Sequence, residues 1–177
     1  MCSKILSMLC FISVLVGQPT PITQDNIYEA VDLWVDDNAT ALATYGEINT
    51  WDVSLITDMS ELFKDKMWFN DDIGNWDVSS VTTMNGMFNN AYSFNQDLSN
   101  WNVSSVTDLE EMFFFANTFN QDLSSWDVSS VTNMSGVFRS AYSFNGDISN
   151  WDVFSVTNMN GMFYGASSFN QDLSSWN

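Results

Sequence analysis

The sequence predicts an α/β repeat fold in which 25-residue units stack into a right-handed solenoid. Each unit is expected to add one short parallel β-strand and one short α-helix. Tryptophan recurs at positions 51, 76, 101, 126, 151 and 176, always 25 residues apart, with no insertion or deletion. Each unit also contains one stretch with helical spacing and one with the alternation of a strand. A helix ahead of the first unit is expected to cap the stack.

The expected helix of each unit follows from the spacing of its apolar residues. In the fourth unit, Met134, Val137, Phe138 and Ala141 lie at i, i+3, i+4 and i+7, which is one face of a helix of about two turns. The second, third and fifth units repeat this pattern with similar residues. A threonine two residues ahead of the face, Thr132 in this unit, can cap the free amides.

The expected strand surrounds each tryptophan. Trp126 and Val128 alternate with polar neighbours, which places the apolar pair on one face of a short strand. Leu123 precedes the pair with the i, i+3, i+5 spacing of leucine-rich repeats, so the solenoid is expected to be leucine-rich-repeat-like. A single unit buries too little apolar surface to fold alone, so neighbouring units must stabilise each other.

A row of asparagines recurs with the same period. Each follows a phenylalanine, and the members are Asn95, Asn120, Asn145 and Asn170. When units stack in register, such an amide can bond the turn backbone of its own unit and of the next. We interpret this row as structural.

Residues 1–17 have the layout of a secretory signal peptide, with a cation at Lys4 and an apolar run over residues 5–16. The run has about twelve residues and a spanning helix needs roughly 20, so an uncleaved membrane anchor is the weaker alternative. Gln18 stands where a bacterial lipoprotein needs a cysteine, so lipid anchoring is not expected. Cleavage would remove both cysteines and leave a secreted chain of net charge −19, because Lys4 leaves with them.

Residues 18–50 are expected to form an N-terminal capping helix and half a unit. Thr23 is the predicted N-cap, and Ile22 is expected to pack on Ile27 as a hydrophobic staple. The apolar face of this helix would cover the open edge of the first unit. Ile48 lies 25 residues before the equivalent isoleucine of the first unit, which predicts the half unit around it.

Residues 51–177 hold five units and the first two residues of a sixth. A stack that stops at Trp176 and Asn177 leaves an unpaired edge without a polar cap. We therefore expect the chain to be the truncated product of a longer repeat protein. The alternative is a structural protein that self-associates end to end through this last unit.

The composition weakens several classes of function. The 177 residues include 22 acidic and 4 basic side chains and no histidine, for a net charge of −18. Such a chain repels a phosphate backbone, so nucleic-acid binding is not expected. The chain lacks the usual base for a serine nucleophile, and its carboxylates repeat identically, whereas a glycosidase needs two carboxylates in unlike environments. Catalysis is not expected, and a secreted hydrolase is the remotest alternative.

Two columns of aspartates repeat with the units. Carboxylates about 4.8 Å apart repel each other, and a divalent cation relieves that repulsion. The competing interpretation is an Asx turn, in which each carboxylate bonds the backbone two residues on. Calcium is hypothesised for the first column, which Asn102 interrupts and which contains Asp52, Asp77, Asp127 and Asp152. The second column, open to the same two interpretations, contains Asp72, Asp97, Asp122, Asp147 and Asp172.

Recognition is expected where the units differ. The fourteenth and fifteenth places of each unit follow the helix face and should point outward, and there the later units carry Phe114, Phe115, Arg139 and Tyr164. These four are the predicted binding residues, as an exposed aromatic patch. The alternative is that their rings pack against the following loop.

Three sequons for N-glycosylation begin at Asn38, Asn102 and Asn133. They would be modified only in a eukaryotic secretory pathway and only where exposed. Asn102 falls on an expected strand and Asn133 at the start of an expected helix, so Asn38 is the preferred glycosylation candidate.

The recurring motif W-D-V-S-S-V-T-x-M-x-x-M-F-x-x-A-x-x-F-N-Q-D-L-S resembles the BspA-like leucine-rich-repeat surface proteins, in the subgroup first described from mycoplasma surface lipoproteins. The resemblance covers residues 51–177, and Ala30–Trp34 is similar to the entry segment of such proteins. The chain departs from them in having no lipobox cysteine and no C-terminal anchor or cap. The resemblance implies an extracellular, non-enzymatic surface or adhesion role.

The leading hypothesis is an extracellular scaffold that binds a protein or a glycan at a cell surface. It expects no catalysis, no membrane span in the mature chain and no cofactor other than the hypothesised calcium.

Overall fold

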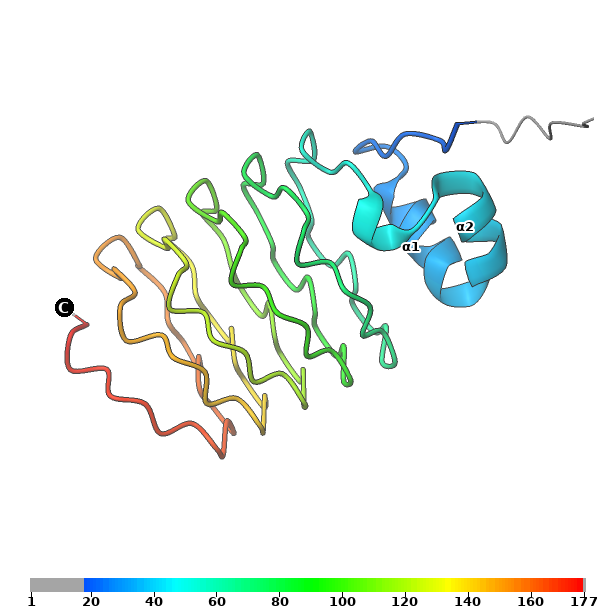
Figure 1. Ribbon diagram of the computed structural model, residues 1–177. Helices are drawn as coiled ribbons and strands as arrows, with labels where there is room; N and C mark the ends of the chain where they lie inside the picture. Colours follow the sequence, from blue (N-terminus) through cyan, green and yellow to red (C-terminus); the bar gives the residue numbers. More distant parts are fainter. Residues whose placement is uncertain (1–17, 177) are drawn as a thin grey trace, which may run out of the picture.

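The computed structural model describes residues 18–176, so the predicted signal peptide lies outside the described residues. Two helices come first, α1 at Ile27–Asp36 and α2 at Asn38–Tyr45, and a 3₁₀ turn, η1, spans Ile48–Thr50. The chain then winds through successive coils that lie side by side, as Figure 1 shows. Each coil is one 25-residue repeat, and we number the repeats 1 to 5 from the tryptophans at positions 51 to 151.

The predicted fold class is wrong. Within residues 51–176 the structure contains no α-helix and no strand, so the repeats do not form the expected leucine-rich-repeat-like α/β solenoid. Strand-type pairing among the described residues is limited to single parallel bridges between neighbouring repeats. These bridges join, in order, Asp58, Thr83, Asp108, Asn133 and Asn158. The bridged residues lie beyond the segment around each tryptophan in which a strand was expected.

The predicted helices do not form because their amides have other partners. In an α-helix each amide donates to the carbonyl four residues earlier. In repeat 4 every second amide from Met134 to Ser140 donates instead to repeat 5, as the Met134 amide does to the Asn158 carbonyl at 2.8 Å. Two of the intervening amides, those of Val137 and Arg139, close turns with the carbonyl three residues earlier, as Arg139 does with Gly136 at 3.0 Å. One segment thus forms both the turns of its coil and a ladder to the next coil.

Two left-handed residues in each repeat also prevent a helix. In repeat 4 they are Gly136 and Ser140, with φ of 64° and 55°. Repeats 1 and 3 place Glu61 and Glu111 where repeat 4 has Gly136, with φ of 59° and 52°. A side chain there is strained in a way that glycine is not. The apolar residues at i, i+3, i+4 and i+7 still point inward across these turns, so the predicted burial is correct although the helix is absent.

The segment around each tryptophan is held by the indole instead of by strand pairing. The indole Nε1 donates to a backbone carbonyl 28 residues earlier, and Trp101 reaches the Ile73 carbonyl in this way at 3.1 Å. Trp76 reaches the Ile48 carbonyl at 2.8 Å, so Ile48 occupies the place expected for half a repeat. The tryptophan rings also stack, with the centroids of Trp101 and Trp126 6.5 Å apart.

Three columns of aromatic rings form the core of the stack. One column consists of the tryptophans, and the other two consist of phenylalanines. Phe88 lies 5.5 Å from Phe113 of the next repeat and 4.0 Å from Phe94 of its own repeat, with nearly parallel rings. Identical side chains pack this closely only when successive coils keep the same register. This constraint explains why the 25-residue period has no insertion.

The bonds predicted from the asparagine row to the next repeat are confirmed. The Asn120 amide donates to Asn95 Oδ1 at 2.9 Å, and the Asn145 amide donates to Asn120 Oδ1 at 2.7 Å. The row begins one repeat earlier than predicted, because Asn70 accepts the Asn95 amide at 2.8 Å. These side chains satisfy turn amides in the coil that follows.

The helix α1 and the residues before it cover the open edge of repeat 1. Gln24 Oε1 accepts the amides of Thr57 and Asp58, each at 3.0 Å. In later repeats the equivalent threonine amide bonds the preceding coil, as Thr82 does with the Thr57 carbonyl at 2.8 Å. The Gln24 side chain therefore takes the place of a preceding coil, which protects an edge that would otherwise be unpaired.

The start of α1 differs from the prediction. Its N-cap is Asn26 and not Thr23, and the Thr23 amide donates to Asn26 Oδ1 at 2.8 Å. The buried face of the helix consists of Ile27, Ala30, Val31 and Trp34. Within residues 18–176, no helix has the length and apolar character needed to cross a membrane.

We predict that Trp101→Phe lowers the free energy of unfolding by about 2–4 kcal/mol. The smaller ring leaves a gap in the buried column, and removal of the indole N–H breaks one of the two hydrogen bonds that the Ile73 carbonyl accepts, the other coming from the Trp76 amide. Trp68→Phe is the matched control, because Trp68 is 81% exposed, and it should change the value by less than about 0.5 kcal/mol. Urea unfolding measures both variants. Equal losses in the two would contradict the role given to the indole hydrogen bond.

Candidate functional site

The structure brings the four predicted binding residues together. They lie at the end of the ladder that joins neighbouring coils. The Phe115 amide donates to the Arg139 carbonyl at 3.0 Å, and the Ser140 amide donates to the Tyr164 carbonyl at 2.8 Å. This register aligns side chains from the same place in successive repeats.

Arg139 lies between aromatic rings of the two neighbouring repeats. Its guanidinium carbon is 5.6 Å from the Phe114 ring centroid and 5.2 Å from the Tyr164 centroid, which are distances for cation–π attraction. Phe115 packs edge-on against Phe114 with a centroid separation of 4.6 Å, and Tyr142 lies 6.4 Å from Phe115. We call these five residues, Phe114, Phe115, Arg139, Tyr142 and Tyr164, the aromatic patch.

The aromatic patch is partly exposed to solvent. Tyr164 is 69% exposed and Phe115 is 37% exposed, whereas Phe114 is half-buried. The rings therefore pack against one another and still present aromatic surface. Phe115 has a φ of 54°, a left-handed conformation that costs an ordinary residue roughly 1–2 kcal/mol. Other repeats place residues that tolerate this conformation better at the same position, namely Asp65, Asn90 and Gly165.

Sequence reasoning missed a second apolar surface, at the helical end of the stack. Met67 and Trp68 of repeat 1 are both exposed. The sequence did contain a signal for this surface, because repeat 1 has Trp68 at a position where every later repeat has serine or threonine. The equivalent residues of the later repeats are Ser93, Thr118, Ser143 and Ser168.

The aspartates of the first column hold turns. Asp127 Oδ1 accepts the Ser129 hydroxyl at 2.6 Å and the Ser129 amide at 3.1 Å, and Asp52 and Asp77 make the same two bonds to their own serines. These hydrogen bonds, the hydroxyl bond first, lower the pKa of the three carboxyls. Asp152 accepts a backbone amide at the same place, 3.1 Å away.

The geometry gives the calcium hypothesis no support. Asn102 interrupts the first column and still holds Ser104 with the same two bonds, at 3.2 and 2.7 Å, so the turn does not need a charge. The second column makes similar turns, as Asp97 does by accepting the Ser99 amide at 2.8 Å. In the part of the chain that the structure describes, no three acidic or cysteine side chains gather closely enough to hold a metal ion.

The glycosylation candidate Asn38 is the exposed first residue of α2. The threonine of its sequon, Thr40, donates its hydroxyl to Asp37 at 2.7 Å. The contexts predicted for the other two sequons are wrong, because Asn102 holds a turn and Asn133 forms a parallel bridge.

A family model matches most of the chain. Its description is "Mycoplasma protein of unknown function, DUF285", and it matches residues 35–131 and again residues 100–177. Searches among curated proteins and among solved structures found no match. The matched ranges together run from the last turn of α1 through all five repeats.

We predict that acid destabilises the protein through its aspartate turns. Hydrogen bonds from the following serine lower the pKa of six carboxyls, those of Asp52, Asp77, Asp97, Asp127, Asp147 and Asp172. A carboxyl with a lowered folded-state pKa adds stability above its unfolded pKa of about 4 and loses it as the pH falls through the folded value. The melting temperature should therefore decrease as the pH is lowered below about 4.

The control replaces Asp52, Asp77 and Asp127 with asparagine, the residue that already holds the equivalent turn at position 102. Asparagine does not titrate, so the melting temperature of this triple variant should decrease less between pH 7 and pH 3 than that of the parent protein. An acid profile identical to that of the parent protein would contradict the assignment.

Proposed function

We propose that this chain, which belongs to the family described as Mycoplasma protein of unknown function, DUF285, is a non-enzymatic binding protein that acts outside the cell at its surface. The aromatic patch is its recognition surface, and the ligand is a protein or a glycan. The observation that carries the proposal is the arrangement of the patch, in which Arg139 is held between the half-buried Phe114 ring and the exposed Tyr164 ring.

The chemistry of the aromatic patch supports recognition. Apolar side chains that gather on one surface mark interaction sites more often than single exposed residues do. Tyrosine and arginine are enriched among the residues that dominate binding energies. Rings such as those of Phe115 and Tyr164 offer contact area at a low cost in conformational entropy. Arg139, already ordered by its two neighbouring rings, has guanidinium donors for the oxygen atoms of a ligand.

The arrangement of the acidic residues supports a role without catalysis. A hydrolase with two carboxylates places them in unlike environments, so that one is protonated and the other is charged. Here Asp52, Asp77 and Asp127 make the same bonds in three repeats, and all three have a lowered pKa. The sequence contains no histidine, which is the most frequent general base.

The sequence of residues 1–17 supports a location outside the cell, because it has the pattern of an export signal. Both cysteines of the chain lie in that segment. The repeats are therefore held by ring stacking and backbone hydrogen bonds, neither of which depends on the redox state of the compartment.

Binding is tested with an array of glycans and an array of immobilised extracellular-matrix proteins. We predict a ligand whose affinity falls at least about tenfold in Phe115→Ala combined with Tyr164→Ala, because both rings belong to the patch and are exposed to a ligand. Phe154→Ala is the matched control, since Phe154 is 85% exposed but lies outside the patch, and it should keep the affinity. Loss in the control, or full affinity in the double variant, would contradict the proposal.

The location is tested on intact cells that produce the protein. An antibody raised against the repeats should label these cells without permeabilisation, because the proposal places the repeats outside the membrane. An antibody against a cytoplasmic protein of the same cells is the control and should label only permeabilised cells. Labelling of the repeats only after permeabilisation would rule out the surface role.

A further inference from the structure

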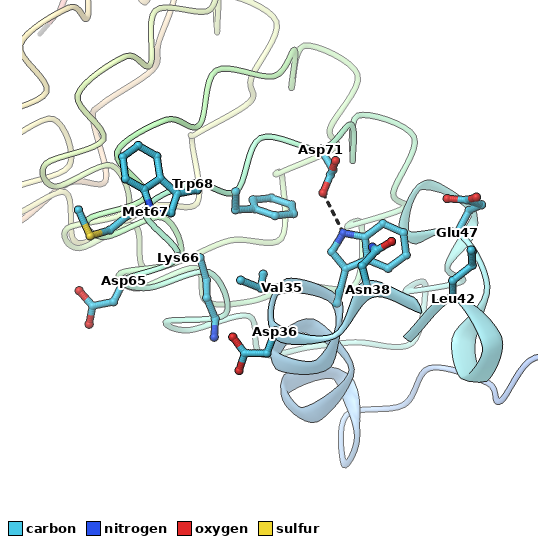
Figure 2. A pocket seen from close by; sticks show the side chains of 12 residues that line it. Val35, Asp36, Asn38, Leu42, Glu47, Asp65, Lys66, Met67, Trp68 and Asp71 are labelled. Carbon is cyan, nitrogen blue, oxygen red and sulfur yellow. Dashed lines mark hydrogen bonds between the residues drawn. The ribbon is translucent and has the colours of Figure 1, made fainter. Parts of the chain in front are cut away.

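A groove of about 750 Å³ lies between the helical segment and repeat 1 and opens to solvent. Its lining comes from the end of α1, from α2 and the residue before η1, and from the loop of repeat 1 that carries Trp68. In Figure 2, Met67 and Trp68 lie on one side of the groove, and Leu42 and Glu47 lie on the other. The groove is thus formed only where the helices meet the repeats.

The groove carries a large exposed apolar surface. Trp68 is the main contributor, because four-fifths of its side chain faces solvent, and Val35, Leu42 and Met67 are exposed beside it. The buried Phe69 lines the groove as well. Half of the lining residues are aromatic or aliphatic and half are polar or charged. A concave site that combines apolar surface with a few polar groups is the usual form of a binding site.

The groove is also negatively charged. Four of its lining residues are acidic, namely Asp36, Glu47, Asp65 and Asp71, and one is basic, Lys66. The Lys66 ammonium donates to Asp32, a residue outside the lining, so its charge is already neutralised. The carboxylate of Asp71 is fixed in place, because Trp34 Nε1 donates to its Oδ2 at 2.8 Å, as the dashed line in Figure 2 marks. The charge that a ligand meets in the groove is therefore negative.

We propose that this groove binds a basic polypeptide segment in which lysine or arginine alternates with apolar residues. The apolar side chains would pack on Trp68, Met67 and Leu42. The cations would lie near Asp36 and Glu47 and over the face of the Trp68 ring, where an aromatic ring attracts a cation. The site is separate from the aromatic patch, so it does not depend on the function proposed above.

Charge complementarity favours this occupant over the alternatives. Phosphate, nucleic acid and acidic peptides would be repelled by the carboxylates of the groove. A neutral ligand would use the apolar wall but would leave the carboxylates without partners. Exposed ion pairs alone bind weakly, so the cation has to be joined to apolar groups that bury the Trp68 ring. An extended segment with alternating side chains meets both requirements.

The test uses two fluorophore-labelled peptides with identical leucines, one with the sequence KLKLK and the other with ELELE. Binding to the purified full chain is followed by fluorescence polarisation at low and at physiological salt. The lysine peptide should bind saturably and more weakly as salt increases, and the glutamate peptide should not bind. Equal binding of the two peptides, or no binding of the lysine peptide, would overturn the proposal.

Two variants with matched controls separate the groove from the general acidity of the chain. Trp68→Ala should lower the affinity for the lysine peptide at least about tenfold. Phe154→Ala should keep that affinity within about twofold of the parent value. Asp36→Asn with Glu47→Gln should weaken binding and reduce its salt dependence. Asp25→Asn with Glu29→Gln changes the net charge equally at residues that do not line the groove, and should have a smaller effect.

Equal losses in a variant and its control would show that the peptide does not bind specifically in the groove, and would overturn the proposal. Because Trp68 is exposed, Trp68→Ala should keep the melting temperature, and Trp68→Phe should restore part of the affinity by keeping an aromatic face. Phe115→Ala with Tyr164→Ala should bind the lysine peptide as the parent does. That result distinguishes failure at the groove from failure at the aromatic patch.

Discussion

The structure depends on hydrogen bonds between neighbouring coils. Every second amide in the segment from Met134 to Ser140 has its acceptor in the next repeat, and corresponding segments of the earlier repeats follow the same rule. A buried amide that loses its partner costs about 1–3 kcal/mol, so a coil without a neighbour would lose several such contributions together. This explains how a chain with almost no regular secondary structure after Thr50 still forms an ordered stack.

The ladder fixes the register, and the register decides which side chains repeat and which are free to vary. Trp101, Phe113 and Asn120 lie inside or along the stack and touch equivalent residues in adjacent coils, so a change at any of them would disturb two neighbours. Residues at the outer end of the ladder, such as Arg139, have no such constraint. Differences between repeats therefore accumulate on that surface, where Phe114 and Tyr164 now hold the arginine.

The acidic character of the chain has a structural origin and a separate consequence. Many aspartates are present because an Asx turn recurs in every repeat, and Asn102 shows that such a turn needs the oxygen atom and not the charge. The resulting negative charge nevertheless determines which ligands can approach. At the helical end it combines with the exposed Trp68 ring, whereas the aromatic patch presents the cation Arg139. The two surfaces are therefore suited to ligands of different charge.

The sequence by itself determined the 25-residue period, the inward residues, the asparagine row and the position of the aromatic patch, because each depends only on spacing along the chain. It could not distinguish a helix from a series of turns, since Met134, Val137, Phe138 and Ala141 point inward in both. That choice depends on where the amides find acceptors, and the acceptors lie in another coil. The groove beside Trp68 likewise depends on packing between α1, α2 and repeat 1, which residues distant in sequence form only after folding.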